Sequence, residues 1–465
     1  MLGKIRRIHF IGIGGAGMSG IAELLLNLGF TVSGSDLKET PVTSRLAKLG
    51  ARIFSGHRAE NISSSEVVVA SSAVPPDNPE VLEAQRLGVP VIPRAEMLAE
   101  LMRLKFSVAV AGAHGKTTVT SMIAVMLTEA GLDPTAVIGG RLDAFGSGAR
   151  LGKGELLVAE ADESDRSFLL LRPSIAVVTN IDREHLDCYR DMDEIKQAFV
   201  SFMNSVPFYG AVIACADAPW REALASIRPR LRRRLTTYGM EPGATVTAVD
   251  MEAHARGARF RVEQSGKAPF PVEIAVPGRH NVQNALAAVC VGLELGLTAE
   301  QIRSGLERFR GADRRFDIKA EVDGVTIVDD YGHHPAEIRA TLDAARAWGA
   351  RRIWAIFQPH RYTRTKFLMD EFGPAFEGCE RVYVLDVYPA GEQPIPGATA
   401  DRLVERMSRQ LGASVRYAPA STDWVEEILA AAEPGVMIVT IGAGTVWKIG
   451  ETLAESLKAG LQVKG

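Results

Sequence analysis

The residues best suited to chemistry lie in short clusters that follow apolar runs. The strongest is Gly112-Ala113-His114-Gly115-Lys116-Thr117-Thr118, between a predicted strand at 107–111 and a helix. Its amides suit phosphate oxygens, Lys116 suits the β- and γ-phosphates, and the Thr117 hydroxyl suits Mg²⁺. Val110 stands where the common P-loop has its first glycine, so the loop is a shorter variant. The cluster predicts an ATP-type phosphate site.

Carboxylates follow the next predicted strand, 156–159, in the segment Glu160-Ala161-Asp162-Glu163-Ser164-Asp165. Carboxylates at a strand end beside a P-loop are natural Mg²⁺ ligands, and a solvated acidic loop is the alternative. His185 lies in segment 179–187, which leaves a third strand toward the same crevice. That position favours a functional histidine over a surface one.

A second glycine cluster follows the predicted strand at 8–13. Gly12, Gly14 and Gly17 fulfil a G-x-G-x-x-G fingerprint, and Asp36 lies about 20 residues further on, where an acid can bind a ribose hydroxyl. The fingerprint suggests an NAD enzyme, although any nucleotide diphosphate fits such a cradle. A tight turn without a ligand is the third alternative.

Further polar clusters occur later in the chain. Asn281 and Asn284 are three residues apart on one helix face, where amides suit an adenine edge, although Asn281 also suits an N-cap. The last third of the chain carries 329–335 (DDYGHHP) and 357–365 (FQPHRYTRT), each after a strand. Arg314 and Arg315 precede them at a predicted domain boundary, where an arginine can reach a phosphate.

The net charge and the placement of the histidines bear on which classes of function are possible. The chain has 465 residues, a net charge of −3 and 9 histidines. Six histidines fall inside the clusters, which favours chemistry over scattered structural roles: His114, His185, His280, His333, His334 and His360. The near-neutral charge predicts no nucleic-acid partner, and the basic segment 228–234 is expected to be a solvated surface.

The cysteine spacing and the hydropathy of the chain predict the cellular compartment of the protein. The 4 cysteines form no CxxC pair, which excludes a disulfide scaffold and suits a reducing, cytoplasmic location. No apolar run is long enough to span a membrane, so no membrane partner is expected. The oligomeric state stays open between a monomer and a weak dimer.

Strand-like runs alternate with helical patterns almost throughout, which predicts an α/β fold built on parallel sheets. We expect a Rossmann-like domain at 1–105, a P-loop ATPase-type domain at 106–312 and a second Rossmann-like domain at 313–465. Alternating apolar residues between 235 and 276 predict antiparallel strands inserted in the central domain.

Taken together, these strings resemble the Mur ligases, the ATP-dependent amide-forming enzymes of peptidoglycan synthesis. The resemblance runs from GIGGAGMSG at 12–20 to IGAGTVW at 441–447. Ala113 and Val119 replace two threonines of the family's usual loop; neither is the phosphate lysine nor the metal hydroxyl. The resemblance implies that L-alanine is joined to the muramoyl carboxylate of UDP-N-acetylmuramate through an acyl phosphate, with ATP as co-substrate and Mg²⁺ as cofactor.

The resemblance also implies roles for individual residues. It implies catalytic roles for Lys116, Glu160, His185, Arg315 and His333, and Mg²⁺ ligation by Thr117, Glu160 and His185. The implied ATP site comprises Gly112, His114, Gly115, Lys116, Thr117, Thr118, Asn281, Asn284, Arg315 and Asp330. The UDP-sugar site comprises Gly14, Gly15, Gly17, Asp36 and Ser71. The side that holds the muramoyl carboxylate and the amino acid comprises Tyr331, His333, His360, Arg361 and Arg364.

Two alternatives remain beside this function. One is the recycling ligase that adds an intact peptide to the same UDP-sugar, and the other is an NAD-dependent oxidoreductase.

The resemblance also bears on a modified lysine, because sister ligases carry a carbamylated lysine near the metal. Here Phe199 takes that position and Lys196 lies nearly one turn earlier, so no carbamate is expected.

Overall fold

The computed structural model describes residues 5–71, 73–142, 147–183, 188–254, 256–418 and 423–464. It divides into two compact units. The first contains Met1–Met251, Phe260–Ile274 and Val282–Phe309, and the second contains Glu252–Arg259, Ala275–Asn281 and Arg310–Gly465. No helix within the described ranges is both long and apolar enough to cross a membrane.

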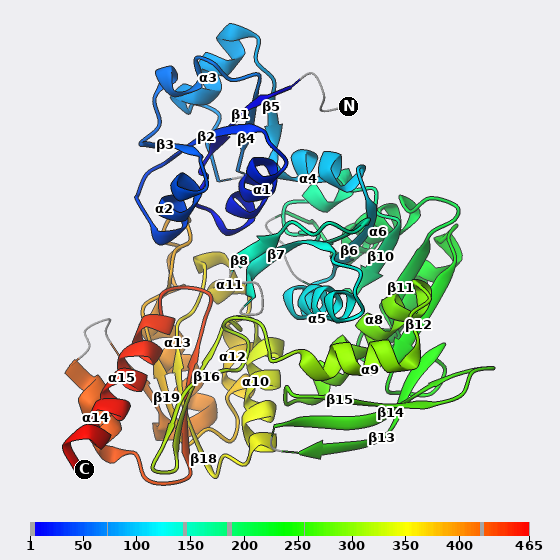
Figure 1. Ribbon diagram of the computed structural model, residues 1–465. Helices are drawn as coiled ribbons and strands as arrows, with labels where there is room; N and C mark the ends of the chain where they lie inside the picture. The colour runs from blue at the N-terminus through cyan, green and yellow to red at the C-terminus, as the bar shows by residue number, and fades with distance from the viewer. Residues whose placement is uncertain are drawn as a thin grey trace. The chain divides into compact units, whose positions relative to one another are not determined.

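The first unit begins with a parallel sheet of order β3-β2-β1-β4-β5 (Figure 1). Its strands are β1 (Arg7–Ile11), β2 (Thr31–Asp36), β3 (Arg52–Ser55), β4 (Val67–Ala70) and β5 (Val91–Pro93). Its helices are α1 (Ala16–Asn27), α2 (Pro41–Lys48), α3 (Pro79–Leu87) and α4 (Arg94–Met102). Phe10 packs in the core that includes α1, and Ile11 packs on the other face with α3, so helices cover both faces. The strand order reverses between β1 and β4, which is where such sheets bind nucleotides.

The second sheet of this unit has ten strands, in the order β15-β14-β13-β12-β11-β10-β6-β9-β7-β8. They are β6 (Phe106–Ala111), β7 (Thr135–Leu142), β8 (Ser147–Arg150), β9 (Leu156–Glu160), β10 (Ile175–Val178), β11 (Ala211–Cys215), β12 (Leu235–Gly239), β13 (Val246–His254), β14 (Gly257–Gln264) and β15 (Phe270–Ile274). The helices of this part are α5 (Lys116–Glu129), α6 (Met192–Asn204), α7 (Arg221–Ile227), α8 (Arg279–Glu294) and α9 (Ala299–Arg308). Strand β6 lies between β10 and β9, parallel to both, so the carboxyl ends of all three meet at one edge.

The expectation of antiparallel strands between 235 and 276 is wrong for β12, which pairs in parallel with β11 and with β13. For the strands that follow it, β14 and β15, the antiparallel direction stays a prediction. Alternating burial identifies a strand with one buried face, and it carries no information on the direction of the neighbouring strand.

The second unit holds a six-stranded sheet of order β16-β17-β21-β18-β19-β20. Its strands are β16 (Asp317–Val322), β17 (Val325–Asp330), β18 (Arg352–Phe357), β19 (Arg381–Val384), β20 (Val415–Tyr417) and β21 (Val436–Ile441). Its helices are α10 (Pro335–Trp348), α11 (Tyr362–Phe367), α12 (Met369–Ala375), α13 (Ala400–Leu411), α14 (Asp423–Ala431) and α15 (Trp447–Lys464). Only β16 runs antiparallel to its neighbour; the other pairs are parallel.

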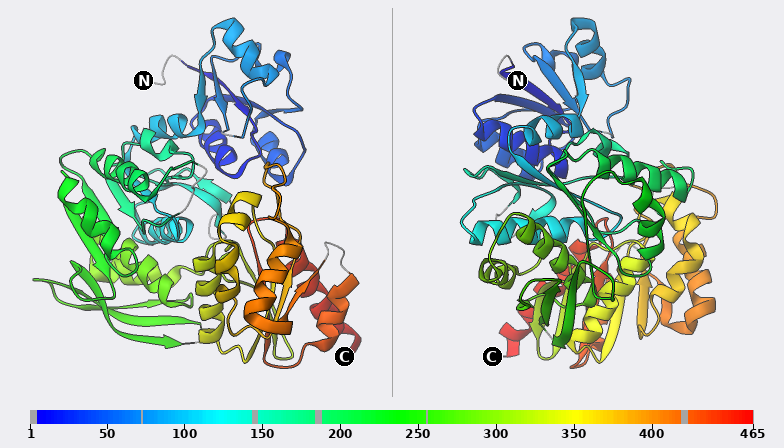
Figure 2. Two further views of the ribbon diagram at one scale, coloured as in Figure 1. Left: turned by 180° about the vertical axis from the view of Figure 1, so that it is seen from behind. Right: turned by 90° about the vertical axis from the view of Figure 1, so that its right-hand side faces the viewer.

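Helices cover both faces of this sheet. One core joins α10, α12 and α13 to the sheet, and a second core joins α14 and α15 to the opposite face, as Figure 2 shows for the yellow-to-orange and red helices. The segments 331–334 and 358–361 leave the carboxyl ends of β17 and β18. The sheet therefore brings both clusters to one edge.

Candidate active site

The phosphate loop lies between β6 and α5 and depends on two glycines. Gly112 has a φ of 133° and Gly115 a φ of 82°. A Cβ atom on Gly112 would lie 2.1 Å from Thr179 Oγ1, and one on Gly115 would lie 2.6 Å from Asn284 Oδ1. A side chain at either position is excluded by conformation and by space.

The loop is held by residues that follow β10. Thr179 Oγ1 and Asn180 Nδ2 both donate to the His114 carbonyl oxygen, at 2.5 and 2.9 Å, and the His114 N–H donates to Asn180 Oδ1 at 2.9 Å. His114 Nε2 lies 3.4 Å from Asp182 Oδ2. Sequence reasoning noted 179–187 as a strand exit and missed this supporting role of Thr179 and Asn180.

Lys116 begins α5, where its ammonium group sits inside the loop. It donates to the carbonyl oxygens of Gly112 at 2.7 Å and Ala113 at 3.2 Å, and to Glu163 Oε1 at 2.9 Å. Burial lowers the pKa of this lysine, but the carboxylates of Glu163, Glu160 and Asp162 raise it by more, so its pKa lies above the ordinary value. The group is therefore a permanent cation.

A carboxylate and a hydroxyl meet beside Lys116. Thr117 Oγ1 donates to Glu160 Oε2 at 3.0 Å, and Glu160 ends β9. Mg²⁺ usually takes one or two protein oxygens together with substrate phosphates, and this donor pair fits that pattern. Within the described ranges no group of three or more His, Cys, Asp or Glu side chains could hold a metal, and His185 lies outside them.

The two asparagines of α8 face different surroundings. Asn284 lies against Gly115 of the phosphate loop, as the short Cβ distance above shows. Asn281 is buried and donates from Nδ2 to the Pro277 carbonyl oxygen at 2.6 Å. The helix begins at Arg279, so Asn281 lies inside it, and the N-cap alternative is wrong.

The first glycine cluster meets Asp36 and Ser71 at the ends of three adjacent strands. Asp36 Oδ2 accepts the Gly14 N–H at 2.9 Å, and the Gly15 N–H donates to the Gly12 carbonyl oxygen at 3.1 Å. Ser71 follows β4 and lies next to Gly12. These two amides already have partners, so a diphosphate at this loop would have to displace them.

Arg94, which sequence reasoning missed, places its guanidinium against Gly17 in the first turn of α1. It also lies 3.7 Å from Asp162. A cation beside the first turn of a helix adds to the positive potential that favours anions at a helix N-terminus. Arg94 begins α4 directly after the short strand β5, and no sequence motif marked it.

In the second unit, Asp330 ties the end of β17 to the segment that carries Arg315. Its oxygens accept the Phe316 N–H and the Gly332 N–H, both at 2.8 Å. Burial raises the pKa of Asp330, and Arg315 and these N–H groups offset part of that rise. Arg315 lies over the Tyr331 ring at 5.4 Å and pairs with Glu337 at 3.4 Å.

Three rings form a row beside this segment. The His333 ring lies 5.4 Å from that of His360, and His360 stacks on Tyr388 at 5.6 Å. Burial, reinforced by Arg364, lowers the pKa of His333 well below its ordinary value and that of His360 to about 3. Both imidazoles are neutral near pH 7.

The arginines that follow β18 are held tightly. Arg361 has a φ of 69°, a conformation that costs a non-glycine residue about 1–3 kcal/mol and that is typical of functional sites. Its N–H donates to the Tyr388 carbonyl oxygen at 2.8 Å, and Glu392 accepts from Thr363. Arg364 Nη1 lies 3.2 Å from His360 Nδ1. Tyr388 and Glu392 follow β19, the strand next to β18, and sequence reasoning missed both.

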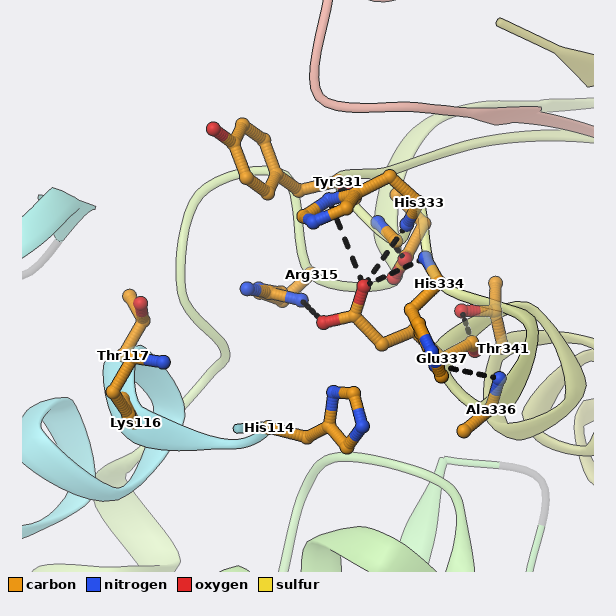
Figure 3. A network of polar contacts seen from close by, with 12 residues as sticks. His114, Lys116, Thr117, Arg315, Tyr331, His333, His334, Ala336, Glu337 and Thr341 are labelled. Carbon is orange, nitrogen blue, oxygen red and sulfur yellow. Dashed lines mark hydrogen bonds and ion pairs between the residues drawn. The ribbon is translucent and has the colours of Figure 1, made fainter. Parts of the chain in front are cut away.

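Glu337 is the third missed residue of this unit. Figure 3 shows its carboxylate between Arg315 and the His333–His334 turn. It stands three residues after His334, the spacing of a capping box, and that spacing is the signal that was available.

Three family models match nearly the whole chain. They are described as the Mur ligase family, catalytic domain (residues 7–106), the Mur ligase middle domain (110–292) and the Mur ligase, glutamate ligase domain (314–444). The chain belongs to the Mur ligase family. The predicted family and the three-part α/β architecture are confirmed, and membership excludes the NAD oxidoreductase alternative.

Curated relatives of this Mur ligase are similar over their full length. It is 54% identical to a UDP-N-acetylmuramate–L-alanine ligase from Koribacter versatilis, covering 99% of both chains. It is 52% identical to one from Geotalea uraniireducens, covering 99% of this chain and 100% of the relative.

Two solved structures share the whole fold. A UDP-N-acetylmuramate-alanine ligase from Thermotoga maritima matches with a TM-score of 0.82 and 29% identity over 98% of this chain and 99% of that one. A murein peptide ligase from Psychrobacter arcticus matches with a TM-score of 0.72 and 25% identity over 97% and 98%. Both the TM-score and the sequence identity are higher for the alanine ligase than for the peptide ligase.

Proposed function

We propose that this Mur ligase joins L-alanine to the muramoyl carboxylate of UDP-N-acetylmuramate, with cleavage of ATP to ADP and phosphate. The observation that carries the proposal is the full-length identity to relatives of that name, in a chain that contains the phosphate loop and both C-terminal clusters. The reaction makes a precursor of peptidoglycan.

The first step requires two anions to approach each other. The muramoyl carboxylate attacks the γ-phosphorus of ATP, which forms an acyl phosphate and releases ADP. Lys116 offers a permanent cation and the loop amides offer donors, so both lower the charge repulsion in the transition state. Mg²⁺, when bound at Glu160, Thr117 and His185, would neutralise further phosphate charge. Arg315 is assigned to the transferred phosphoryl group.

The second step requires a neutral amine. The amine of alanine attacks the acyl carbon, and phosphate leaves from the tetrahedral intermediate. His333 Nδ1 lies 3.1 Å from the Tyr331 carbonyl oxygen, which can only accept, so the proton of the neutral ring sits on Nδ1. Nε2 then carries the lone pair, and we assign it as the acceptor of the amine proton. Arg361 and Arg364 are assigned to the carboxylates of the substrates, and Tyr331 and His360 to the same group of residues around the muramoyl carboxylate and the alanine.

The nucleotide sites are divided between two loops. We assign ATP to the phosphate loop, with Asn281 and Asn284 on the adenine side and with Asp330 as a further residue of the ATP site. We assign the UDP diphosphate to Gly14, Gly15 and Gly17, with Asp36 and Ser71 beside it. Titration with UDP-N-acetylmuramate and with NADH tests the second assignment, because tight NADH binding without UDP-sugar binding would contradict it.

A phosphate-release assay tests the whole function. The enzyme is supplied with ATP, Mg²⁺ and UDP-N-acetylmuramate, together with L-alanine, glycine, L-serine or the murein tripeptide in separate reactions. We expect rapid release with L-alanine and none without the UDP-sugar. Release with the tripeptide and not with L-alanine would instead establish the recycling ligase.

A further inference from the structure

Glu337 occupies the centre of the polar network in the second unit (Figure 3). Its side chain is 11% exposed, at the third position of α10. A carboxylate that is so little exposed needs partners for both of its oxygens, and both have them.

One oxygen holds the histidine turn. Oε2 accepts the His333 N–H at 2.9 Å and the His334 N–H at 3.2 Å, and lies 3.6 Å from His333 Nδ1. A capping box requires only the His334 contact. The additional contact to the His333 amide fixes the backbone from which the His333 imidazole projects.

The other oxygen faces a cation. Oε1 accepts from Arg315 Nη1 at 3.4 Å. Arg315 is 25% exposed and reaches Glu337 from the segment before β16, while Glu337 belongs to α10. One carboxylate thus joins two groups that are 18 residues apart along the chain.

We propose that Glu337 is a positioning residue of the ligase reaction: one oxygen fixes the His333–His334 turn and the other orients the Arg315 guanidinium. The inference rests on the proposed function for the roles of His333 and Arg315. The negative charge of Glu337 also raises the pKa of His333 and of His360. Burial and Arg364 lower both pKa values by more.

A pair of substitutions separates positioning from helix capping. In Glu337→Gln the amide oxygen can still accept the two N–H groups, so the cap and the fold are retained, while the amide N–H₂ cannot pair with Arg315. Glu337→Ala loses both the hydrogen bonds to the His333–His334 turn and the pair with Arg315. Glu300→Gln is the matched control, because Glu300 is an exposed first-turn carboxylate of α9 paired with Arg303 at 2.6 Å.

We expect Glu337→Gln to lower kcat about tenfold to hundredfold, with an unchanged KM for UDP-N-acetylmuramate and an unchanged melting temperature. The acid limb of the kcat/KM profile for L-alanine should move to lower pH, because His333 loses a nearby negative charge. Glu300→Gln should match the wild type. If Glu337→Gln keeps the wild-type kcat and pH profile and only Glu337→Ala is less stable, Glu337 is a cap and the proposal is overturned.

A structural readout keeps this test independent of the proposed function. Nitrogen NMR of the imidazoles reports the tautomer and pKa of His333 in wild type and Glu337→Gln, whatever reaction the enzyme catalyses. A shifted His333 pKa supports positioning, and identical spectra contradict it. A wild-type enzyme that releases no phosphate with L-alanine would contradict the proposed function alone.

Discussion

At the scale of single residues, the contacts of Lys116 define what its removal should do. Its ammonium group has three partners, of which only Glu163 carries a charge. Loss of the lysine therefore removes the cation that pairs with the buried Glu163 carboxylate, and under the proposed ATP site that carboxylate would face phosphates of the same charge.

We predict that Lys116→Ala lowers the rate of phosphate release about hundredfold to thousandfold or more, the range for one lost electrostatic donor. Lys153→Ala, at an exposed lysine of the same unit, is the control and should retain full activity. Steady-state phosphate release with circular dichroism of both variants is the measurement. Near-normal turnover of a folded Lys116→Ala enzyme would refute the assigned site.

At the scale of elements, the phosphate loop is specified by contact with the next strand exit. Thr179 Oγ1 occupies the space that a Cβ atom on Gly112 would need, and the same hydroxyl holds the His114 carbonyl. The loop cannot change at this position without moving the segment after β10.

We predict that Gly112→Ala abolishes ATP binding and destabilises the first unit by more than the strain of a positive φ alone, which is about 1 kcal/mol. Gly131→Ala is the matched control. Gly131 has a φ of 80° with nothing within 4 Å of its built Cβ atom, so this variant should show only the conformational cost. Isothermal titration with ATP and denaturant unfolding compare the two, and equal losses would contradict the steric explanation.

Helix α6 bears on the expected absence of a carbamate. Phe199 is buried and packs edge-on against Phe168 at 5.4 Å, and Lys196 lies 3.5 Å from Asp193. A phenyl ring offers no oxygen ligand to a hard cation, and the amine of Lys196 pairs with a carboxylate of its own helix.

We predict that added bicarbonate leaves the activity unchanged and that Lys196→Ala retains most of it. Phe199→Ala should cost about 3–5 kcal/mol of stability, because it empties a core position. Activity assays with and without bicarbonate test the first part, and mass spectrometry of Lys196 tests it directly. A rise in activity with bicarbonate, lost in Lys196→Ala, would show a carbamate.

The elements also show what a sequence can and cannot predict. Phosphate-loop residues could be identified because they are contiguous, and 331–335 and 358–364 because each leaves a parallel strand at the same edge. Glu337 could have been identified from its capping-box spacing to His334. Tyr388 and Arg94 carry no such string, because each comes from an element elsewhere in the chain that folds against the cluster, so the information lies in tertiary contacts. The direction of β12 was missed because burial alternation is the same in either direction.

At the scale of the whole molecule, the two units should respond differently to acid. The second unit holds three histidines whose pKa values are lowered mainly by burial: His333 well below the ordinary value, His360 to about 3 and His280 to about 4. Below pH of about 6.5 the unfolded chain binds protons at these rings and the folded unit does not. Stability is therefore complete above that pH and falls as the pH decreases.

We predict that the second unit loses up to about 1 kcal/mol of unfolding free energy per pH unit and per histidine between pH 6.5 and 5. Carboxylates contribute little in this window, because most are ionised in both states. Tryptophan fluorescence reports this unit, since four of the 5 tryptophans (Trp348, Trp354, Trp424 and Trp447) belong to it. In His360→Gln the unfolding free energy of the second unit should depend less steeply on pH. An unchanged slope would contradict the assignment of this pH dependence to the buried histidines.

The internal partners of Lys116 carry a thermodynamic consequence for nucleotide binding. The loop already has its folded shape, with the ammonium group held by Gly112, Ala113 and Glu163. Under the proposed assignment, ATP would exchange one set of partners for another without ordering a flexible segment, so little backbone entropy would be lost. Calorimetry should give a small heat-capacity change on ATP binding, and hydrogen exchange at 112–118 should already be slow before the nucleotide arrives. In Glu163→Gln the charged partner of Lys116 is replaced by a neutral amide, which competes less with the phosphates of ATP for the ammonium group. This variant should therefore bind ATP more tightly, with unchanged hydrogen exchange at 112–118.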